Sequence, residues 1–319
     1  MEKNRYALGI GLNLFDARAI FLKEDGKILA EVKKDRTNIS ANETLKVLIE
    51  LFEEILSATK KYKHSIEGVG IALGGIVNNK KGVVYWPQVP DSYIAVPLRD
   101  YLEKKFDFPV LIENDATACA WAEYMMNFPK CKNLIYLFSG VGCGMIIDGK
   151  LYKGSDGGAG ELFLNSHKTM SSPLGDFSFF KHWPADLGMV KAAERLISLG
   201  NETGLVKKIS PTGELSLEDI FNEARKKDRV AKDTMKEAAF SLGVKIAFLV
   251  NLLNPDTVII GGGLEKAGEF FLEECTRVVK RFAFNEMSQN CKFFLSQLGA
   301  DATSLGAATL VFKENTLQR

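Results

Sequence analysis

The sequence has few features that would tie the chain to a membrane or to nucleic acid. Among 319 residues, 41 Lys and Arg balance 40 Asp and Glu, and the net charge of +1 gives no electrostatic footprint for nucleic acid. No apolar run is long enough to span a bilayer, and the first residues lack the apolar segment of a secretory signal. We therefore expect a cytoplasmic protein with no membrane contact and no direct nucleic-acid partner.

Cysteine is scarce and scattered along the chain. The five cysteines never form a C-x-x-C pair, which indicates reduced thiols and argues against a disulfide framework or a zinc site. The chain also lacks the P-loop pattern G-x-x-x-x-G-K-[ST] and a G-x-G-x-x-G near its start, so the ordinary NTPase and dinucleotide-binding interpretations are excluded.

What the chain does contain is a repeated order of secondary structure. Residues 6–12, 17–22 and 27–33 are typical of a β-meander with an Asp-Gly turn, and an amphipathic helix and a strand at 68–72 follow. A second meander, helix and strand in the same order occur at residues 134–138, 144–148, 150–152, 230–253 and 257–260. This repetition predicts an internal duplication of an α/β unit, with a site between the halves.

An apolar strand-like run ends abruptly in the polar residues Glu113, Asn114 and Asp115. Ligands bind beyond the carboxyl ends of strands in open α/β sheets, and a carboxylate placed there can accept a proton from a substrate hydroxyl. Asp115 is therefore a candidate catalytic base. The same residues allow a second interpretation, in which Asn114 or Asp115 caps the following helix at 117–126, because both residue types are favoured at the N-cap.

Three glycine-rich stretches follow or join strands, at residues 139–144, 154–160 and 261–263. Glycine lets the backbone approach a phosphate closely, and free N–H groups in such turns attract anions. A glycine between two strands is also common in an ordinary turn, so each stretch alone leaves a phosphate-binding role open.

Taken together, these motifs resemble the ROK family of sugar kinases and sugar-responsive repressors. The matching stretches are residues 113–116, 140–144, 154–161 and 254–263, with 75–78 and 86–90 at the family's sugar-lining loops and 306–308 in its closing helix. The resemblance implies an α/β protein with the duplicated actin-like (ribonuclease H-like) ATPase fold and a cleft between two domains. Residues 1–114 plus about 302–319 would form the smaller domain and 115–301 the larger.

The resemblance also implies roles for residues at matching positions. Asp115 matches the base that deprotonates the sugar hydroxyl, and Asn114 and Glu161 match residues that hydrogen-bond the sugar. Gly75 and Gln88 are further substrate-binding candidates. The cofactor-binding candidates are Ser139, Gly140, Gly142, Gly144, Gly261, Gly262 and Gly263. ATP and Mg²⁺ are the family's phosphoryl donor and metal ion, and a homodimer is expected because family members are commonly dimers.

Two stretches depart from the family pattern. The family's kinases end their first strand in an Asp-x-Gly-Gly-Thr phosphate loop, whereas residues 11–15 read Gly-Leu-Asn-Leu-Phe, without the acid, the paired glycines or the hydroxyl. Asp16 is out of register and is expected in an exposed turn. The family's zinc-binding His and Cys residues are missing from residues 164–183, so no zinc is expected. The aromatic residues at 177–183 are expected to pack that loop instead.

Three functions remain open. The first is ATP-dependent phosphorylation of a hexose or N-acetylhexosamine with Asp115 as base, weakened by the degenerate phosphate loop. The second is a non-catalytic sugar sensor or transcriptional regulator homologue without a DNA-binding domain, because the first strand begins near Tyr6. The third is a scaffold without a ligand, against which stands the cost of keeping Glu113, Asp115 and Glu161 in a cleft without partners.

Overall fold

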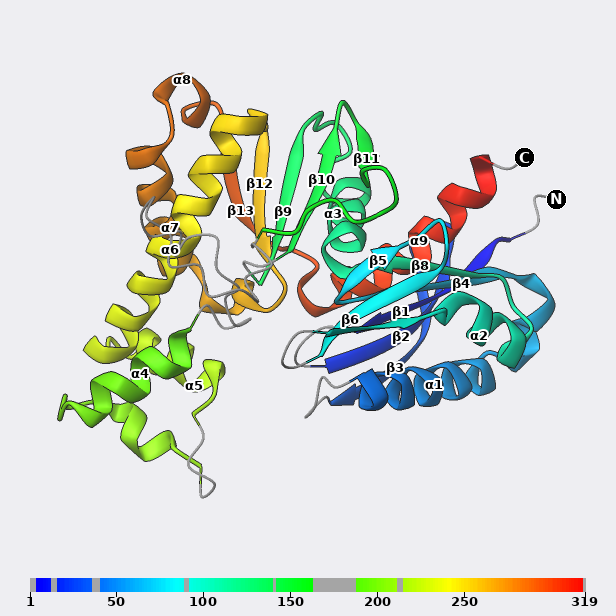
Figure 1. Ribbon diagram of the computed structural model, residues 1–319, viewed down its shortest axis with the longest axis horizontal. Helices are drawn as coiled ribbons and strands as arrows, with labels where there is room; N and C mark the ends of the chain where they lie inside the picture. The colour runs from blue at the N-terminus through cyan, green and yellow to red at the C-terminus, as the bar shows by residue number, and fades with distance from the viewer. Residues whose placement is uncertain are drawn as a thin grey trace. The chain divides into compact units, whose positions relative to one another are not determined.

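The computed structural model describes residues 4–12, 16–35, 41–88, 92–139, 142–162, 188–210 and 215–317 (Figure 1). The chain divides into two compact units. Unit 1 comprises Met1–Phe138, Gly142–Glu161 and Ser296–Arg319, and unit 2 comprises Ser139–Val141 and Leu162–Leu295. The domain boundary expected between residues 114 and 115 stays a prediction.

Unit 1 contains a five-stranded sheet in the order β3-β2-β1-β4-β8. The first three strands form the predicted antiparallel meander, and the last two add in parallel. Their bounds are β1 (Tyr6–Leu12), β2 (Asp16–Lys23), β3 (Ile28–Asp35), β4 (Ile66–Leu73) and β8 (Val110–Asn114). Strand β1 is buried along its whole length, as its central place in the sheet requires.

Helix α1 (Ala41–Ala58) is the predicted amphipathic helix of the first repeat, and a short 3-10 helix η1 (Lys60–Ser65) follows it. The apolar residues Leu48, Leu51 and Phe52 of α1 are fully buried in one core with the apolar side chains of β1 and β2. Since burial of apolar area dominates folding energetics, this face fixes α1 on the sheet.

A small antiparallel sheet in the order β5-β6-β7 follows β4, and the sequence pattern did not predict it as a sheet. Its strands are β5 (Ile76–Asn78), β6 (Val83–Gln88) and β7 (Ser92–Val96), and helix α2 (Leu98–Phe106) connects it to β8. The buried residues Val77, Val84 and Trp86 join the core of the five-stranded sheet, so this sheet is part of unit 1.

The second predicted meander is present in unit 1. Strands β9 (Leu134–Phe138), β10 (Gly142–Ile147) and β11 (Lys150–Tyr152) pair in antiparallel fashion. Two helices complete the unit, α3 (Asp115–Met126) and α9 (Ala302–Leu317), the latter preceded by the 3-10 helix η5 (Gly299–Asp301).

Helix α9 packs very closely on the first sheet. A Cβ atom on Gly9 would lie 2.1 Å from the Ser304 carbonyl oxygen, and one on Gly70 would lie 1.9 Å from that of Ala307. No larger residue fits at these two strand positions, because the helix backbone occupies the space.

Unit 2 contains the parallel strand pair β12 (Thr257–Gly261) and β13 (Lys292–Leu295). Its helices are α4 (Met189–Ser198), η3 (Gly204–Lys208), α5 (Leu217–Arg225), α6 (Arg229–Leu253), η4 (Leu264–Ala267), α7 (Glu269–Phe282) and α8 (Asn285–Ser288). Helix α6 is the predicted long helix of the second repeat. It begins at the N-cap Asp228, which accepts a hydrogen bond from the Ala231 N–H, and ends at the left-handed Asn254.

All five cysteines are free, as predicted. None of the helices in the described part of the chain has the length and apolar character needed to cross a membrane.

Candidate functional site

Strand β8 carries Asn114 and Asp115 to the point where α3 begins. Asn114 is the N-cap of α3, and its Oδ1 accepts a hydrogen bond from the Thr117 N–H at 3.2 Å. Oδ1 of Asp115 accepts a hydrogen bond from the Ala116 N–H at 2.7 Å. The capping interpretation is thus confirmed for Asn114, because its side chain satisfies one of the N–H groups at the start of the helix. The helix start also fixes the orientation of the Asp115 carboxylate.

A glycine pair lies beside this helix start. Asn114 Nδ2 donates a hydrogen bond to the Gly75 carbonyl oxygen at 3.3 Å, and Trp86 Nε1 donates to that of Gly74 at 3.0 Å. Gly75 has a φ of +112°, a conformation that other residues rarely adopt. A Cβ atom on Gly74 would lie 3.3 Å from Oδ2 of Asp115, so this loop runs against the carboxylate.

Glu161 joins the site from another segment of unit 1. Its backbone forms an isolated antiparallel bridge with Gly142, and the Cys143 N–H donates to the Gly160 carbonyl oxygen at 2.9 Å. The Glu161 side chain keeps access to solvent. Nevertheless, the surrounding protein and then the Asp115 carboxylate raise the pKa of Glu161 to about 7. The two carboxylates therefore lie near enough to influence each other's charge.

A buried cluster of charged side chains contacts the Asn114 backbone, and the sequence analysis did not predict it. Glu113 is fully buried, and its Oε2 lies 2.8 Å from Lys153 Nζ and accepts a hydrogen bond from Asn79 Nδ2 at 3.3 Å. Its Oε1 accepts a hydrogen bond from the Asn114 N–H at 3.0 Å. Burial lowers the pKa of Lys153, but the charges and hydrogen bonds of Glu113 and Glu314 outweigh it and raise the pKa overall. The one signal in the sequence was a glutamate inside an apolar strand.

Among the predicted cofactor-binding residues, Ser139 and the glycine triplet lie together in unit 2. The Ser139 N–H donates a hydrogen bond to the Gly261 carbonyl oxygen at 3.1 Å, and its hydroxyl donates to that of Gly262. The Gly263 N–H donates to Oε2 of Glu265 at 2.8 Å. The Ser139 hydroxyl is thus engaged with the turn that follows β12.

Gly142 and Gly144 lie elsewhere, in β10 of unit 1, where they pack against α3. A Cβ atom on Gly144 would lie 2.1 Å from the Ala116 carbonyl oxygen, and one on Gly142 would lie 3.1 Å from the Ala116 Cβ. The close approach of helix and strand requires glycine at position 144 whether or not a ligand binds there.

Some predicted features lie outside the described residues. They are Gly140, the whole zinc-motif region at residues 164–183 and the aromatic loop within it. Gln88 is the last residue of β6, and its side chain is likewise outside the description.

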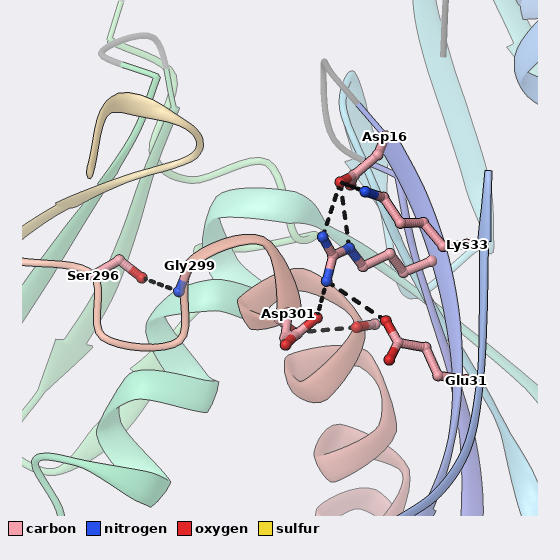
Figure 2. Close-up of polar contacts among 8 residues, drawn as sticks. Asp16, Glu31, Lys33, Ser296, Gly299 and Asp301 are labelled. Carbon is pink, nitrogen blue, oxygen red and sulfur yellow. Dashed lines mark hydrogen bonds and ion pairs between the residues drawn. The ribbon is translucent and has the colours of Figure 1, made fainter. Parts of the chain in front are cut away.

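Figure 2 shows a network of charges around Asp16, at the start of β2. Asp16 is buried, so its prediction as an exposed turn residue was wrong. Its Oδ2 lies 3.1 Å from Arg18 Nη2 and 3.8 Å from Lys33 Nζ, while Arg18 also binds Asp301 and lies 3.6 Å from Glu31. The sequence pattern could not show this, because Asp301 comes from the far end of the chain.

The space beside Gly11 is filled by the start of α9. The motif resemblance puts Gly11 where the family's kinases would carry an acid, but a Cβ atom there would lie 2.5 Å from the Ser304 nitrogen and 2.8 Å from the Thr303 Cβ. An acidic side chain at this position would require α9 to shift. The end of β1 is therefore unsuited to supply a Mg²⁺ ligand at position 11. Within the described ranges, no group of three or more metal-ligating side chains is found.

The fold defines the chain as an α/β protein with the actin-like two-domain fold shared by sugar kinases and related regulators. Residues 6–314 match the ROK family, and the chain belongs to this family. The resemblance drawn from its motifs is thereby confirmed.

Similar proteins include both regulators and kinases. A xylose repressor of Caldicellulosiruptor bescii is 30% identical over 279 residues, which cover 85% of this chain and 68% of the repressor. A glucokinase of Halalkalibacterium halodurans is 27% identical over 328 residues, which cover 99% of this chain and 98% of the enzyme. The crystal structure of a ROK family glucokinase from Streptomyces griseus in complex with glucose and AMPPNP has a TM-score of 0.78 and 26% identity, covering 97% of this chain and 99% of that one.

Proposed function

We propose that this chain binds a monosaccharide at the site formed by Gly75, Asn114, Asp115 and Glu161. The observation that carries the proposal is the convergence of two interacting carboxylates and a fixed amide from separate segments of unit 1. Carboxylate oxygens accept hydrogen bonds from sugar hydroxyls, and an amide can both donate and accept them. The glucose bound in the Streptomyces glucokinase supports a sugar as the ligand class.

The role that the geometry supports best is sugar sensing without catalysis. The position of the kinase acid is occupied by Gly11, and α9 leaves no room for a larger side chain there. The Ser139 hydroxyl is engaged with Gly262. The 30% sequence identity with a xylose repressor supports a sugar-responsive regulator. This similarity adds a pentose to the hexoses and N-acetylhexosamines to be tested.

ATP-dependent phosphorylation of the sugar is a second candidate, favoured by the orientation of Asp115. The hydrogen bond from the Ala116 N–H holds this carboxylate at the start of α3. In a kinase, Asp115 would accept the proton of the attacking sugar hydroxyl. The residues offered for ATP within unit 2 are Ser139 and Gly261 to Gly263. The residue at position 11 does not fit a Mg²⁺ ligand, which makes this the weaker candidate.

Thermal melting tests the two candidates together. Purified protein is melted with xylose, glucose or N-acetylglucosamine, each with and without Mg²⁺ and AMPPNP, because a ligand at about 100 times its Kd adds about 2.7 kcal/mol of stability. A sugar-dependent shift without any further shift from the nucleotide supports a sensor. A further nucleotide shift together with phosphosugar formation from ATP supports the kinase. If no sugar shifts the melting temperature, sugar binding at this site is contradicted.

A further inference from the structure

A pocket lies in unit 1 beside β8, the edge strand of the five-stranded sheet. It has a volume of about 470 Å³, within the range of roughly 300–1,000 Å³ that is usual for small-molecule sites. Its walls come from the starts of β4 and β8, the loop after β5, α2, Lys153 and α9. The residues of the proposed sugar site do not line this pocket.

Two acidic side chains in the wall are already engaged within the fold. The Glu67 carboxylate lies 2.6 Å from Arg5 Nε. Oε1 of Glu103 accepts a hydrogen bond from the Val110 N–H at 2.9 Å, at the exposed edge of β8. Both carboxylates therefore have partners that offset their charge or occupy an oxygen.

Two basic side chains in the wall have no such partner. Within the described part of the chain, neither Arg99 nor Lys80 has a carboxylate within ion-pair distance, and Arg99 Nη2 donates a hydrogen bond to the Lys80 carbonyl oxygen at 2.7 Å. A Cβ atom on Gly82 would lie 2.4 Å from Arg99 Nε, so a glycine makes room for the half-buried arginine. A guanidinium held by a hydrogen bond, in a pocket that a lysine also lines, suits a phosphate group, which can accept two hydrogen bonds from arginine.

The lining of the pocket also offers hydrogen-bond acceptors. Glu314 lies 3.3 Å from Lys153, and Asn79, whose Nδ2 donates to Glu113, has its own amide oxygen. Such groups accept hydrogen bonds from hydroxyls. We propose that this pocket binds a small phosphorylated polyol such as a sugar phosphate, with its phosphate at Arg99 and Lys80 and its hydroxyls at Asn79 and Glu314.

The pocket also connects with the proposed sugar site. Lys153 lines the pocket and is paired with Glu113, which holds the Asn114 N–H. A ligand whose hydroxyls bind Glu314 and Asn79, the partners of Lys153 and Glu113, would disturb the contact of Glu113 with Asn114, so the two ligands should alter each other's affinity by the same factor. This coupling rests on the proposed function, whereas binding to the pocket does not.

The test is isothermal titration of glucose 6-phosphate into the wild type and three variants. Arg99→Gln and Lys80→Gln remove the phosphate contacts, and Lys81→Gln is the matched control, since Lys81 is an exposed neighbour that does not line the pocket. We expect binding to weaken about 10-fold or more in Arg99→Gln, because hydrogen bonds to charged groups are the strong ones, and to stay unchanged in Lys81→Gln. Equal affinity in the wild type, Arg99→Gln and Lys80→Gln would overturn the proposal, as would no binding to the wild type.

Further arms separate the sources of a signal. Inorganic phosphate should bind more weakly than glucose 6-phosphate and should also depend on Arg99; equal affinities would refute the hydroxyl contacts. Binding that is lost in Glu161→Gln but kept in Arg99→Gln would place the ligand in the sugar site and overturn the pocket. Coupling is read from sugar affinity with and without glucose 6-phosphate. A wild type that binds no sugar but still shows Arg99-dependent binding would refute the proposed function and leave the pocket supported.

Discussion

Replacing Gly11 with aspartate tests whether a kinase-like first phosphate loop can be restored by a single substitution. Gly11→Asp returns the acid that the family's kinases carry at this position. The structure indicates that the side chain has no space, because its Cβ would lie 2.5 Å from the Ser304 nitrogen and 2.8 Å from the Thr303 Cβ. We therefore expect the variant to lose stability and to gain no phosphoryl-transfer activity.

The expected loss follows from two terms. Forcing extra atoms into a packed core costs typically about 1–3 kcal/mol. The carboxylate would also be desolvated beside the buried strand β1, opposite Arg18, whose guanidinium is already shared by Asp16 and Asp301, and a further buried charge there costs about another 1–3 kcal/mol. A total of roughly 4 kcal/mol, the middle of the combined range, corresponds to a fall of roughly 8–16 °C in melting temperature for a domain of this size.

The assay is thermal melting together with a coupled test for phosphosugar formation. Gly26→Asp is the matched control, because a Cβ atom at Gly26 meets nothing within 4 Å and the cost is limited to its left-handed backbone, about 1–2 kcal/mol. If Gly11→Asp melts like the wild type, or if it acquires ATP-dependent activity, the packing argument is wrong.

Three further substitutions probe the site and its supports. Glu161→Gln should remove a pH dependence of stability. Because the pKa of Glu161 is raised, the folded wild type holds a proton that the unfolded chain releases above about pH 4.5, so its stability, read by melting across pH, should fall as the pH rises from there through about 7. An identical profile in the variant would remove Glu161 as the source of this dependence. Gly144→Ala should cost about 1–3 kcal/mol in denaturant unfolding, because its Cβ would meet the Ala116 carbonyl oxygen; an unchanged midpoint would contradict this. Lys153→Met should destabilise the protein by about 3–5 kcal/mol, because it leaves Glu113 buried without its cation. Adding Glu113→Gln should recover part of that loss, whereas additive effects of the two substitutions would argue against a coupled pair.

Local pattern was sufficient to predict much of the fold. The alternation and Asp-Gly turns of both meanders predicted β1 to β3 and β9 to β11, and apolar periodicity predicted α1 and α6, because each signal lies within one short stretch of chain. The small sheet of β5 to β7 was missed, since residues 76–78 and 86–88 were interpreted as parts of loops by family analogy alone.

The parts of the site that depend on distant partners could not be predicted. Glu113 was recognised as polar, but its pairing with Lys153 and Asn79 depends on the folded chain. Asp16 was expected at the surface because its partners Arg18 and Asp301 meet only in three dimensions. Gly144 illustrates a third case, in which a glycine that suggested a phosphate loop has a packing reason that only the position of α3 reveals.

The most direct test of the central claim is the affinity of the protein for the sugar that stabilises it best, measured by isothermal titration. The comparison is between the wild type, Glu161→Gln and the control Glu202→Gln, an exposed glutamate in unit 2. The proposed site requires sugar binding that is weakened about 10-fold in Glu161→Gln, from the loss of a charged acceptor, and unchanged in Glu202→Gln. Equal affinities for all three proteins would show that the sugar does not use Glu161 and would contradict the proposed site.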